Sequence, residues 1–293
     1  MTAPAWTRLE DRGVIAVRGE DSRSFLQGIV SNDMNKVSAT RAAWGAFLTP
    51  QGKYLFDFFM VFDGDTLLIE TERARLAEFV KRLTLYKLRG KVDLADVSND
   101  YAVFAVFGDG TPSALGLDDE RGAAAARDGG VAFVDPRLAD AGARLILPAS
   151  GSGETFASLQ AADAGAYDRL RLRLGLPDGS RDLIVDKSTL MENGFDELGG
   201  IDWHKGCYMG QEVTARTKHR GLVKKRLMPV EIEGDAPDAG TPVTIGDREV
   251  GELRSSNGDI GLAILRLDAL DGDPVLSAGG ASLHPRRPDW ASF

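Results

Sequence analysis

Short apolar runs of strand length, separated by turn-forming residues, dominate the first half of the chain. Those that predict strands are 14–17, 54–62, 66–70, 92–97, 101–107 and 144–147. Asp63-Gly64-Asp65 lies between two of these runs and predicts a β-hairpin. The apolar run 44–48 ends at Pro50-Gln51-Gly52, which predicts a turn.

Three segments predict helices. In residues 73–85 the apolar positions 76, 79, 80 and 83 share one helical face, and charged residues occupy the other. Asp21 or Ser22 can cap a short helix that runs through Phe25 and Ile29. The third helix starts near Phe156, continues to Leu174 and ends at Gly175-Leu176-Pro177, although its Arg/Leu alternation also fits a strand.

The pattern changes after Arg226. The apolar runs 227–232, 243–245, 250–253 and 260–265 are separated by Gly, Asp, Pro and Asn. Such spacing predicts a small all-β sandwich or barrel for roughly the last 70 residues. The part before it mixes helices and hairpins, so the fold class is α+β.

Length, charge and cysteine content exclude several classes of protein. The chain has 293 residues, a net charge of −9 and one cysteine. That length suggests roughly two domains, with three small ones also possible. A single cysteine cannot form a disulfide within the chain, so a disulfide scaffold is excluded. It also cannot provide the four cysteines of a zinc or iron–sulfur site without another protein. The acidic balance argues against direct binding to nucleic acid.

We also expect no membrane association. The first residues carry neither an apolar signal region nor an amphipathic leader rich in Arg and Ser. No apolar run is long enough to span a bilayer. These features predict a cytoplasmic protein in a reducing compartment.

Common catalytic motifs are absent from the sequence. There is no dinucleotide-binding glycine fingerprint, no phosphate-binding loop with Gly-Lys-Ser/Thr, and no Gly-x-Ser-x-Gly. The three histidines do not have the spacing of metal ligands on a helix, and His204 with Cys207 supplies only two ligands.

The most unusual segment is Lys205-Gly206-Cys207-Tyr208-Met209-Gly210-Gln211-Glu212. It places the only thiol between two glycines, which favours a tight, exposed loop over a core strand. Lys205 before the thiol, and Arg216 and Lys218 after it, can stabilise a thiolate, which is the form that attacks electrophiles and binds soft metals. A lone cysteine is more often a small buried hydrophobe. The glycine and lysine neighbours favour the functional interpretation here.

A basic segment follows. Residues 216–226 contain six Lys or Arg and no acidic residue, so the rest of the chain carries a net charge of −15. The segment suits an anionic ligand or an acidic partner protein, and a solvated basic turn explains it equally well. Nucleic acid is the least favoured partner because no aromatic residues are interleaved with the charges.

Residues 25–33, Phe-Leu-Gln-Gly-Ile-Val-Ser-Asn-Asp, form the second distinctive segment. A short amphipathic helix leads into polar residues that can bond to a heterocyclic ligand. A helix followed by an ordinary Asn/Asp turn explains the same pattern.

Together these segments resemble the YgfZ family of folate-binding proteins, relatives of the glycine-cleavage T-protein, an aminomethyltransferase. Residues 205–212 match the family signature K-G-C-Y-x-G-Q-E at every fixed position, and 25–33 resembles its N-terminal folate segment. Residues 86–89, 173–177 and 214–227 also fit, the last resembling most the mitochondrial iron–sulfur assembly branch and its bacterial relatives. The resemblance covers most of the chain.

The resemblance implies a three-domain aminomethyltransferase-like fold. Residues 1–50 with 152–212 would form a discontinuous folate-binding α+β domain. Residues 51–151 would form a ferredoxin-like middle domain, and 213–293 a C-terminal β-barrel.

The implied activity is to assist the assembly or repair of iron–sulfur clusters of the [4Fe–4S] kind, with tetrahydrofolate as ligand. In bacteria the family is tied to iron–sulfur enzymes that modify tRNA. The expected partners are an A-type scaffold protein and iron–sulfur client enzymes. Cluster iron needs thiolate ligands, commonly four per cluster, and this chain offers one. We therefore expect Cys207 to supply one metal ligand to a transient cluster shared with the scaffold.

The remaining site residues follow from the same resemblance. Lys205 and Arg216 would lower the thiol pKa and offset cluster charge, while Tyr208, Gln211 and Glu212 would shape the loop or contact the partner. The expected cofactor-binding residues are Gln27, Asn32, Asp33, Glu192, Arg216 and Arg226. The family often has Pro-x-Glu before the signature, where this chain has Leu190-Met191-Glu192. The glutamate that would contact the pterin amino group is therefore present in an altered loop.

Two other functions remain open. A folate-dependent one-carbon transferase would share the fold, but aminomethyltransferases lack the cysteine signature. A thiol enzyme with Cys207 as nucleophile needs a base, and only His204 lies close in sequence. A maturation factor that is not itself an enzyme fits better than either.

Overall fold

The computed structural model describes residues 3–87, 89–151, 155–221, 223–272 and 274–293. The chain divides into two compact units. The first comprises Met1–Leu48, Phe56–Tyr167 and Gly199–Met209, and the second Thr49–Leu55, Asp168–Leu198 and Gly210–Phe293. In the described part of the chain, no helix has both the length and the apolar character to cross a membrane.

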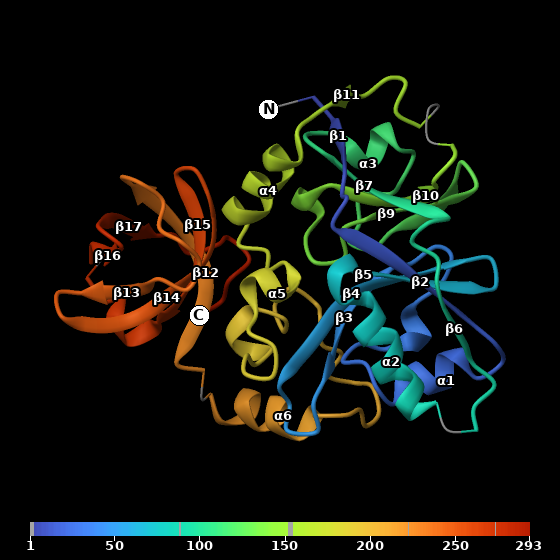
Figure 1. The fold of residues 1–293 in the computed structure, drawn as a ribbon, viewed down its shortest axis with the longest axis horizontal. Coiled ribbons are helices and arrows are strands. Elements are labelled where there is room, and N and C mark those ends of the chain that lie inside the picture. The colour runs from blue at the N-terminus through green and yellow to red at the C-terminus, as the bar shows by residue number, and fades with distance from the viewer. Residues whose placement is uncertain (1–2, 88, 152–154, 222, 273) are drawn as a thin grey trace. The chain divides into compact units, whose positions relative to one another are not determined.

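Two sheets form the framework of the first unit (Figure 1). The six-stranded sheet has the order β11-β1-β7-β10-β9-β8, and the five-stranded sheet the order β3-β4-β5-β2-β6. The first contains β1 (Ala5–Arg8), β7 (Tyr101–Phe107), β8 (Ala124–Arg127), β9 (Gly130–Val134), β10 (Ala143–Pro148) and β11 (Gln160–Ala161). The second contains β2 (Arg12–Arg18), β3 (Ala43–Leu48), β4 (Tyr54–Asp63), β5 (Thr66–Glu72) and β6 (Asp93–Asp96).

The predicted hairpin is present, because β4 pairs with β5 in antiparallel register up to the contact between Asp63 and Thr66. The helices in this part of the chain are short. They are α1 (Ser22–Gln27), η1 (Met34–Lys36), η2 (Arg73–Arg75), α2 (Leu76–Tyr86), α3 (Thr111–Ala114) and η3 (Ala139–Ala141).

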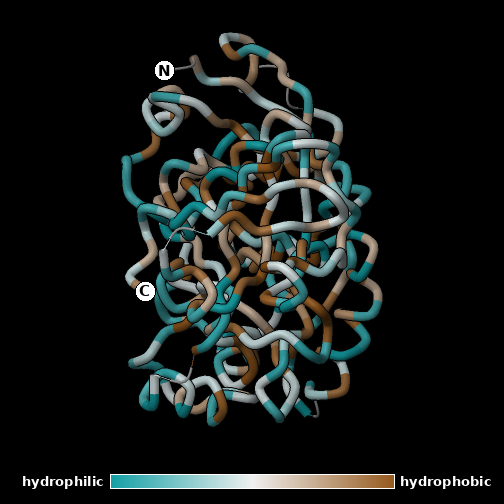
Figure 2. The backbone as a smooth tube through the Cα atoms, turned by 90° about the vertical axis from the view of Figure 1, so that its left-hand side faces the viewer, coloured by the Kyte–Doolittle hydropathy of each residue, from teal (hydrophilic) through white to brown (hydrophobic). Residues whose placement is uncertain are grey.

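Helix α2 has the amphipathic face that its sequence predicts. Leu76, Phe79 and Leu83 are buried. The Phe79 ring stacks on Phe56 of β4, with the ring centroids 4.5 Å apart. Burying such aromatic rings removes a large apolar area from water, which holds the helix against the sheet. Figure 2 shows brown, hydrophobic stretches in the interior and teal at many outer turns.

A buried ion network connects the two sheets. Glu70 of β5 accepts hydrogen bonds from Arg12 Nε of β2 at 2.6 Å and from Arg144 Nη1 of β10 at 2.7 Å. Asp135 accepts two bonds from the Arg137 guanidinium, at 3.0 and 2.8 Å. Burial opposes the ionised form of Asp135, but Arg137 and Arg144 outweigh it and hold the pKa of that carboxyl below its usual value. All five of these charged side chains are at least nine-tenths buried.

The predicted third helix is shorter than expected. It is α4 (Ala164–Arg173), and the chain around Phe156 is not helical. Residues 160–161 pair with β1, and the Ala162 amide donates to Trp6 O at 2.8 Å, so the backbone is extended there. The helix ends before Gly175, as predicted, and Gly175 has a φ of +71°.

The second unit contains a closed six-stranded barrel (orange to red in Figure 1), which is one of the two all-β architectures that the spacing of the apolar runs predicts and the one that the family resemblance implies. Its strand order is β12-β15-β14-β13-β16-β17. The strands are β12 (Lys225–Glu233), β13 (Pro242–Ile245), β14 (Arg248–Asn257), β15 (Ile260–Arg266), β16 (Leu276–Ala278) and β17 (Ala281–Pro285). The other elements there are α5 (Gly179–Asp182), η4 (Met191–Asn193), α6 (Gln211–Arg220) and η5 (Leu267–Ala269).

Candidate functional site

Backbone and side-chain hydrogen bonds fasten the loop 199–209 to the segment that follows α1. Ser31 Oγ donates to Gly200 O at 2.6 Å, and the Asp202 amide donates to Ser31 O at 3.0 Å. Further along, the Met209 amide donates to Gly28 O at 3.2 Å. The two segments are more than 160 positions apart in sequence, so only the fold brings them together.

Cys207 lies on this loop and is exposed to solvent. Its neighbour Gly206 is also exposed, and a Cβ added there would meet no atom within 4 Å. The loop therefore presents the thiol while its two ends are held. This agrees with the exposed position that the two flanking glycines predict.

Lys205 anchors the same loop from inside. Its Nζ donates to Val30 O and to Asn32 O, both at 2.6 Å, and lies 5.2 Å from the centre of the Tyr208 ring. Burial lowers the pKa of Lys205 to about 8, although the charges of Asp33 and Asp202 act in the opposite direction. Tyr208 is itself buried. The contacts of Lys205 and Tyr208 thus hold the loop in shape around the exposed thiol.

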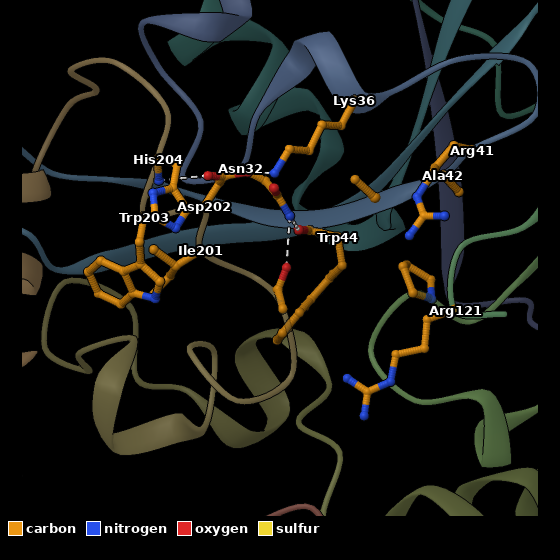
Figure 3. Close-up of a pocket in the computed structure, with 13 residues that line it drawn as sticks. Asn32, Lys36, Arg41, Ala42, Trp44, Arg121, Ile201, Asp202, Trp203 and His204 are labelled. Carbon is orange, nitrogen blue, oxygen red and sulfur yellow. Dashed lines mark hydrogen bonds and ion pairs between the residues drawn. The ribbon is translucent and has the colours of Figure 1, made fainter.

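A pocket of about 340 Å³ opens beside the first part of this loop. Figure 3 shows Ile201, Trp203 and His204 on one side, and Arg41 and Arg121 on the other. Asn32 and Trp44 lie between the two sides, and the remaining lining residues are Lys36, Ala42, Ala43, Pro136, Gly199 and Asp202. The pocket therefore combines an aromatic side with a cationic side.

The cations of the pocket differ in how far they are neutralised. Lys36 forms an ion pair with Asp202. Burial alone would raise the pKa of Asp202, but the Lys36 ammonium and the backbone amides of His204 and Lys205 hold it below its usual value. Arg41 pairs with Glu120 at 2.9 Å, and both of these side chains are largely exposed. Arg121 forms no ion pair with any residue that the structure describes. Its guanidinium is therefore available to an anion.

The backbone around Gly122 explains how Arg121 reaches this pocket. The Ala42 amide donates to Gly122 O at 2.7 Å, and Arg41 bridges to Ala123. A Cβ at Gly122 would lie 2.5 Å from Ala42 O, and the residue has a φ of +77°. Only glycine tolerates this approach and this conformation without strain.

The predicted folate contacts of the first unit form an internal network. Gln27 Nε2 donates to Asp33 Oδ1 at 3.0 Å, and Gln27 Oε1 accepts from the Met34 amide at 2.8 Å. Asn32 Nδ2 donates to Trp44 O and Gly199 O, at 2.7 and 2.8 Å. Of the three, only Asn32 lines the pocket, and both hydrogens of its amide are already used. These side chains shape the site.

The other predicted residues lie in the second unit. Glu192 accepts a hydrogen bond from Thr189 Oγ1 at 2.8 Å, and it lines a separate polar pocket of about 200 Å³. Arg226 is buried and donates to Met191 O at 2.8 Å and to Glu197 at 2.9 Å. Its charge is therefore neutralised within the protein, and its role in binding a cofactor stays a prediction.

The second half of the signature begins α6. Gln211 and Glu212 occupy its first turn, and Gly210 is the residue before it, with a φ of +79°. The predicted turn at Gly52 packs against the start of α6. A Cβ added at Gly52 would lie 2.8 Å from Gly210 O and 2.9 Å from Val213 Cβ. Arg216 is exposed on the middle of α6.

Sequence reasoning missed Trp44, Arg121 and Trp203. Trp203 lies two residues before the signature and could have been noticed, because an aromatic residue close to a reactive loop is a common ligand contact. Trp44 and Arg121 carry no local signal, since only the pairing around Gly122 brings them to the pocket.

Within the described ranges, no group of three or more His, Cys, Asp or Glu is placed to hold a metal ion. A cluster bound at Cys207 would therefore need its other ligands from elsewhere, as the single cysteine already implies.

Comparison with solved structures identifies the fold. The chain matches the glycine cleavage system aminomethyltransferase T from Bartonella henselae with a TM-score of 0.79 and 12% identity, over 99% of this chain and 87% of that one. The aminomethyltransferase-like fold expected from the signature is therefore confirmed. The three domain boundaries that the family resemblance implies stay a prediction.

Sequence comparisons identify relatives. Residues 224–293 match the family model of the CAF17 C-terminal β-barrel domain. The chain is 32% identical to "Iron-sulfur cluster assembly factor IBA57, mitochondrial" of Mus musculus, over 98% of this chain and 86% of the relative. It is also 32% identical to the protein of the same name from Homo sapiens, over 98% and 85%.

The expected cytoplasmic location is wrong on this comparison, because these relatives are named as mitochondrial proteins. The family resemblance itself is confirmed. The identity and coverage show that the chain belongs to the YgfZ/IBA57 family.

Proposed function

We propose that this protein is an accessory factor for the assembly or repair of iron–sulfur clusters, acting on [4Fe–4S] clients. The observation that carries the proposal is the exposed Cys207 on a loop whose ends and whose Lys205 are anchored. The relatives that cover most of the chain are named iron–sulfur cluster assembly factors.

The chemistry requires a second protein. Cys207 loses its proton, and its thiolate bonds to one iron of a cluster while a weaker ligand leaves that iron. Since a cluster is commonly held by four thiolates in total and this chain has one cysteine, a partner must supply the others. An A-type scaffold protein is the partner that we propose, and iron–sulfur enzymes are the clients.

The pocket beside the loop supports tetrahydrofolate as a ligand. A folate has flat aromatic parts joined to a glutamate that carries carboxylates. The Trp203 side suits the aromatic part, and the available guanidinium of Arg121 suits a carboxylate. In this arrangement Asn32 shapes the floor of the pocket, and its amide has no hydrogen left to donate to the ligand.

A second candidate function is a folate-dependent one-carbon transferase. The fold match to aminomethyltransferase T favours it. Fold alone does not determine chemistry, because the same fold carries different activities. A transferase would release or transfer a methylene group from an aminomethyl carrier, whereas an assembly factor would not.

The test is an anaerobic mixing experiment. The protein and its Cys207→Ser variant are each mixed with an A-type scaffold that carries a [2Fe–2S] cluster, with and without tetrahydrofolate. Size exclusion with visible absorption then detects a coloured complex. We expect the complex only with the wild-type thiol, while circular dichroism shows that the variant is folded. A coloured complex of equal yield with Cys207→Ser would overturn the proposal. Folate binding without any complex would support the transferase, which formaldehyde release would then test.

A further inference from the structure

Helix α6 and the start of β12 carry a group of exposed basic residues that the proposed site does not use. We define the cationic ridge as Arg216, His219, Arg220, Lys224 and Lys225, all of which are exposed. The protein as a whole has a net charge of −9, so the ridge is opposite in sign to the net charge of the chain.

The helix positions its share of the ridge on one face. His219 and Arg220 follow Arg216 by three and four residues, so both side chains are neighbours of Arg216 on the helix surface. Thr214, on the other side of the helix, is buried. The face that carries the cations is therefore the one that the protein leaves open to solvent.

Arg216, Arg220, Lys224 and Lys225 form no ion pair with any residue in the described ranges. In the barrel, by contrast, Arg248 and Arg266 both pair with Asp268. A basic residue in the last turn of a helix is expected, because it offsets the helix dipole. That reason does not extend to Lys224 and Lys225, which lie beyond the helix end at Arg220.

The geometry points to the cationic ridge as a docking surface for an acidic face of a partner protein. Charge complementarity would attract such a face to the ridge, while the negative charge elsewhere would repel it, and this fixes one binding orientation. Nucleic acid fits less well, because residues 216–226 contain no Phe, Tyr or Trp on which a base could stack. Cys207 is not one of the ridge residues, so the inference does not depend on cluster binding.

The test uses the full-length protein and a fluorescein-labelled oligoglutamate peptide as the acidic probe, with binding followed by fluorescence anisotropy. The ridge variant carries Arg220→Glu and Lys224→Glu. The matched control carries Lys81→Glu and Arg173→Glu, which are exposed cations that are not part of the ridge, and it changes the net charge equally. An oligouridylate of equal charge serves as the nucleic-acid probe. Every protein is also measured with Cys207→Ser, so that failure of cluster bridging does not affect the result.

We expect the ridge variant to bind the peptide about tenfold more weakly at low salt, and the control to change binding by less than about twofold. The wild-type affinity should fall as the ionic strength rises to about 0.15 M. A variant with Arg220→Lys and Lys224→Arg should bind like wild type. Equal binding by the ridge and control variants would overturn the inference. Ridge-dependent binding of the oligouridylate that is tighter than that of the peptide would also overturn it.

Discussion

The arginines of the buried ion network and those of the cationic ridge are in opposite situations. Arg12 and Arg144 are buried and both donate to Glu70, whereas Arg216 and Arg220 are exposed and have no ion-pair partner among the described residues. A buried charge must be paired, because leaving water costs several kcal/mol. An exposed charge costs little and keeps its attraction for a partner. Changes in the first region should therefore alter stability, and changes in the second should alter binding.

The largest effect is expected from Glu70→Gln. This change keeps the shape of the side chain but removes the charge that two buried guanidiniums share. We expect the free energy of unfolding to fall by about 3–5 kcal/mol, the usual cost of breaking a buried ion pair. Urea unfolding measures it.

Glu120→Gln is the matched control, because it makes the same chemical change in an exposed pair with Arg41. Here we expect a loss of less than about 1 kcal/mol. Similar losses in the two variants would mean that the buried network does not stabilise the protein through its charges.

Lys205→Met should have an intermediate effect. The variant keeps an unbranched apolar stem but removes the two hydrogen bonds to Val30 O and Asn32 O. We expect a loss of about 1–2 kcal/mol in stability. Because the loop loses an anchor, Cys207 should also exchange between more conformations. Hydrogen exchange should then show less protection of the backbone amides next to Cys207. Lys205→Arg keeps donors at this position and should restore most of the protection.

The pH dependence of stability also depends on Lys205. Burial lowers its pKa from 10.5 to about 8 in the folded protein. Between these pH values the unfolded chain binds a proton that the folded protein does not, so the free energy of unfolding rises with pH in this window. The wild type should therefore gain stability relative to Lys205→Met when the pH is raised from 7.5 to 10. A constant difference between the two proteins would contradict a lowered pKa.

Arg121→Gln should have the smallest effect on stability and a clear effect on binding. Since Arg121 has no ion pair among the described residues, its loss should change the melting temperature very little. Its guanidinium is the proposed partner of a folate carboxylate, so calorimetry should show about tenfold weaker binding of tetrahydrofolate.

Arg41→Gln is the matched control for Arg121→Gln, because Arg41 already forms an ion pair with Glu120. We expect that variant to weaken folate binding by no more than about threefold. If Arg121→Gln binds tetrahydrofolate with unchanged affinity, the cationic side of the pocket does not contact the ligand.

Much of the fold could be predicted from local patterns. The hairpin at Asp63-Gly64-Asp65, the apolar face of α2 and the C-terminal barrel all follow from periodicity and turn residues. The start of α4 could not be predicted, because the pairing of residues 160–161 with β1 is a long-range contact that overrides helix propensity.

The site could be predicted only in part. The glycines around Cys207 correctly predict an exposed thiol. Sequence proximity suggests that Lys205 acts on that thiol, but it cannot show that the ammonium is bound to two carbonyl oxygens 170 or more positions away. Arg121 was missed for the same reason, since it reaches the pocket through pairing between distant segments.

Protection of the Cys207 thiol from alkylation shows most directly whether this residue binds a cluster. Iodoacetamide is added anaerobically to the protein alone, to its mixture with the cluster-loaded A-type scaffold, and to its mixture with the cluster-free scaffold. Mass spectrometry follows the alkylation of Cys207. Our account predicts ready alkylation in the free protein and with the cluster-free scaffold, and strong protection only when the cluster is present. Equal alkylation rates in all three samples would show that the thiol does not bind the cluster.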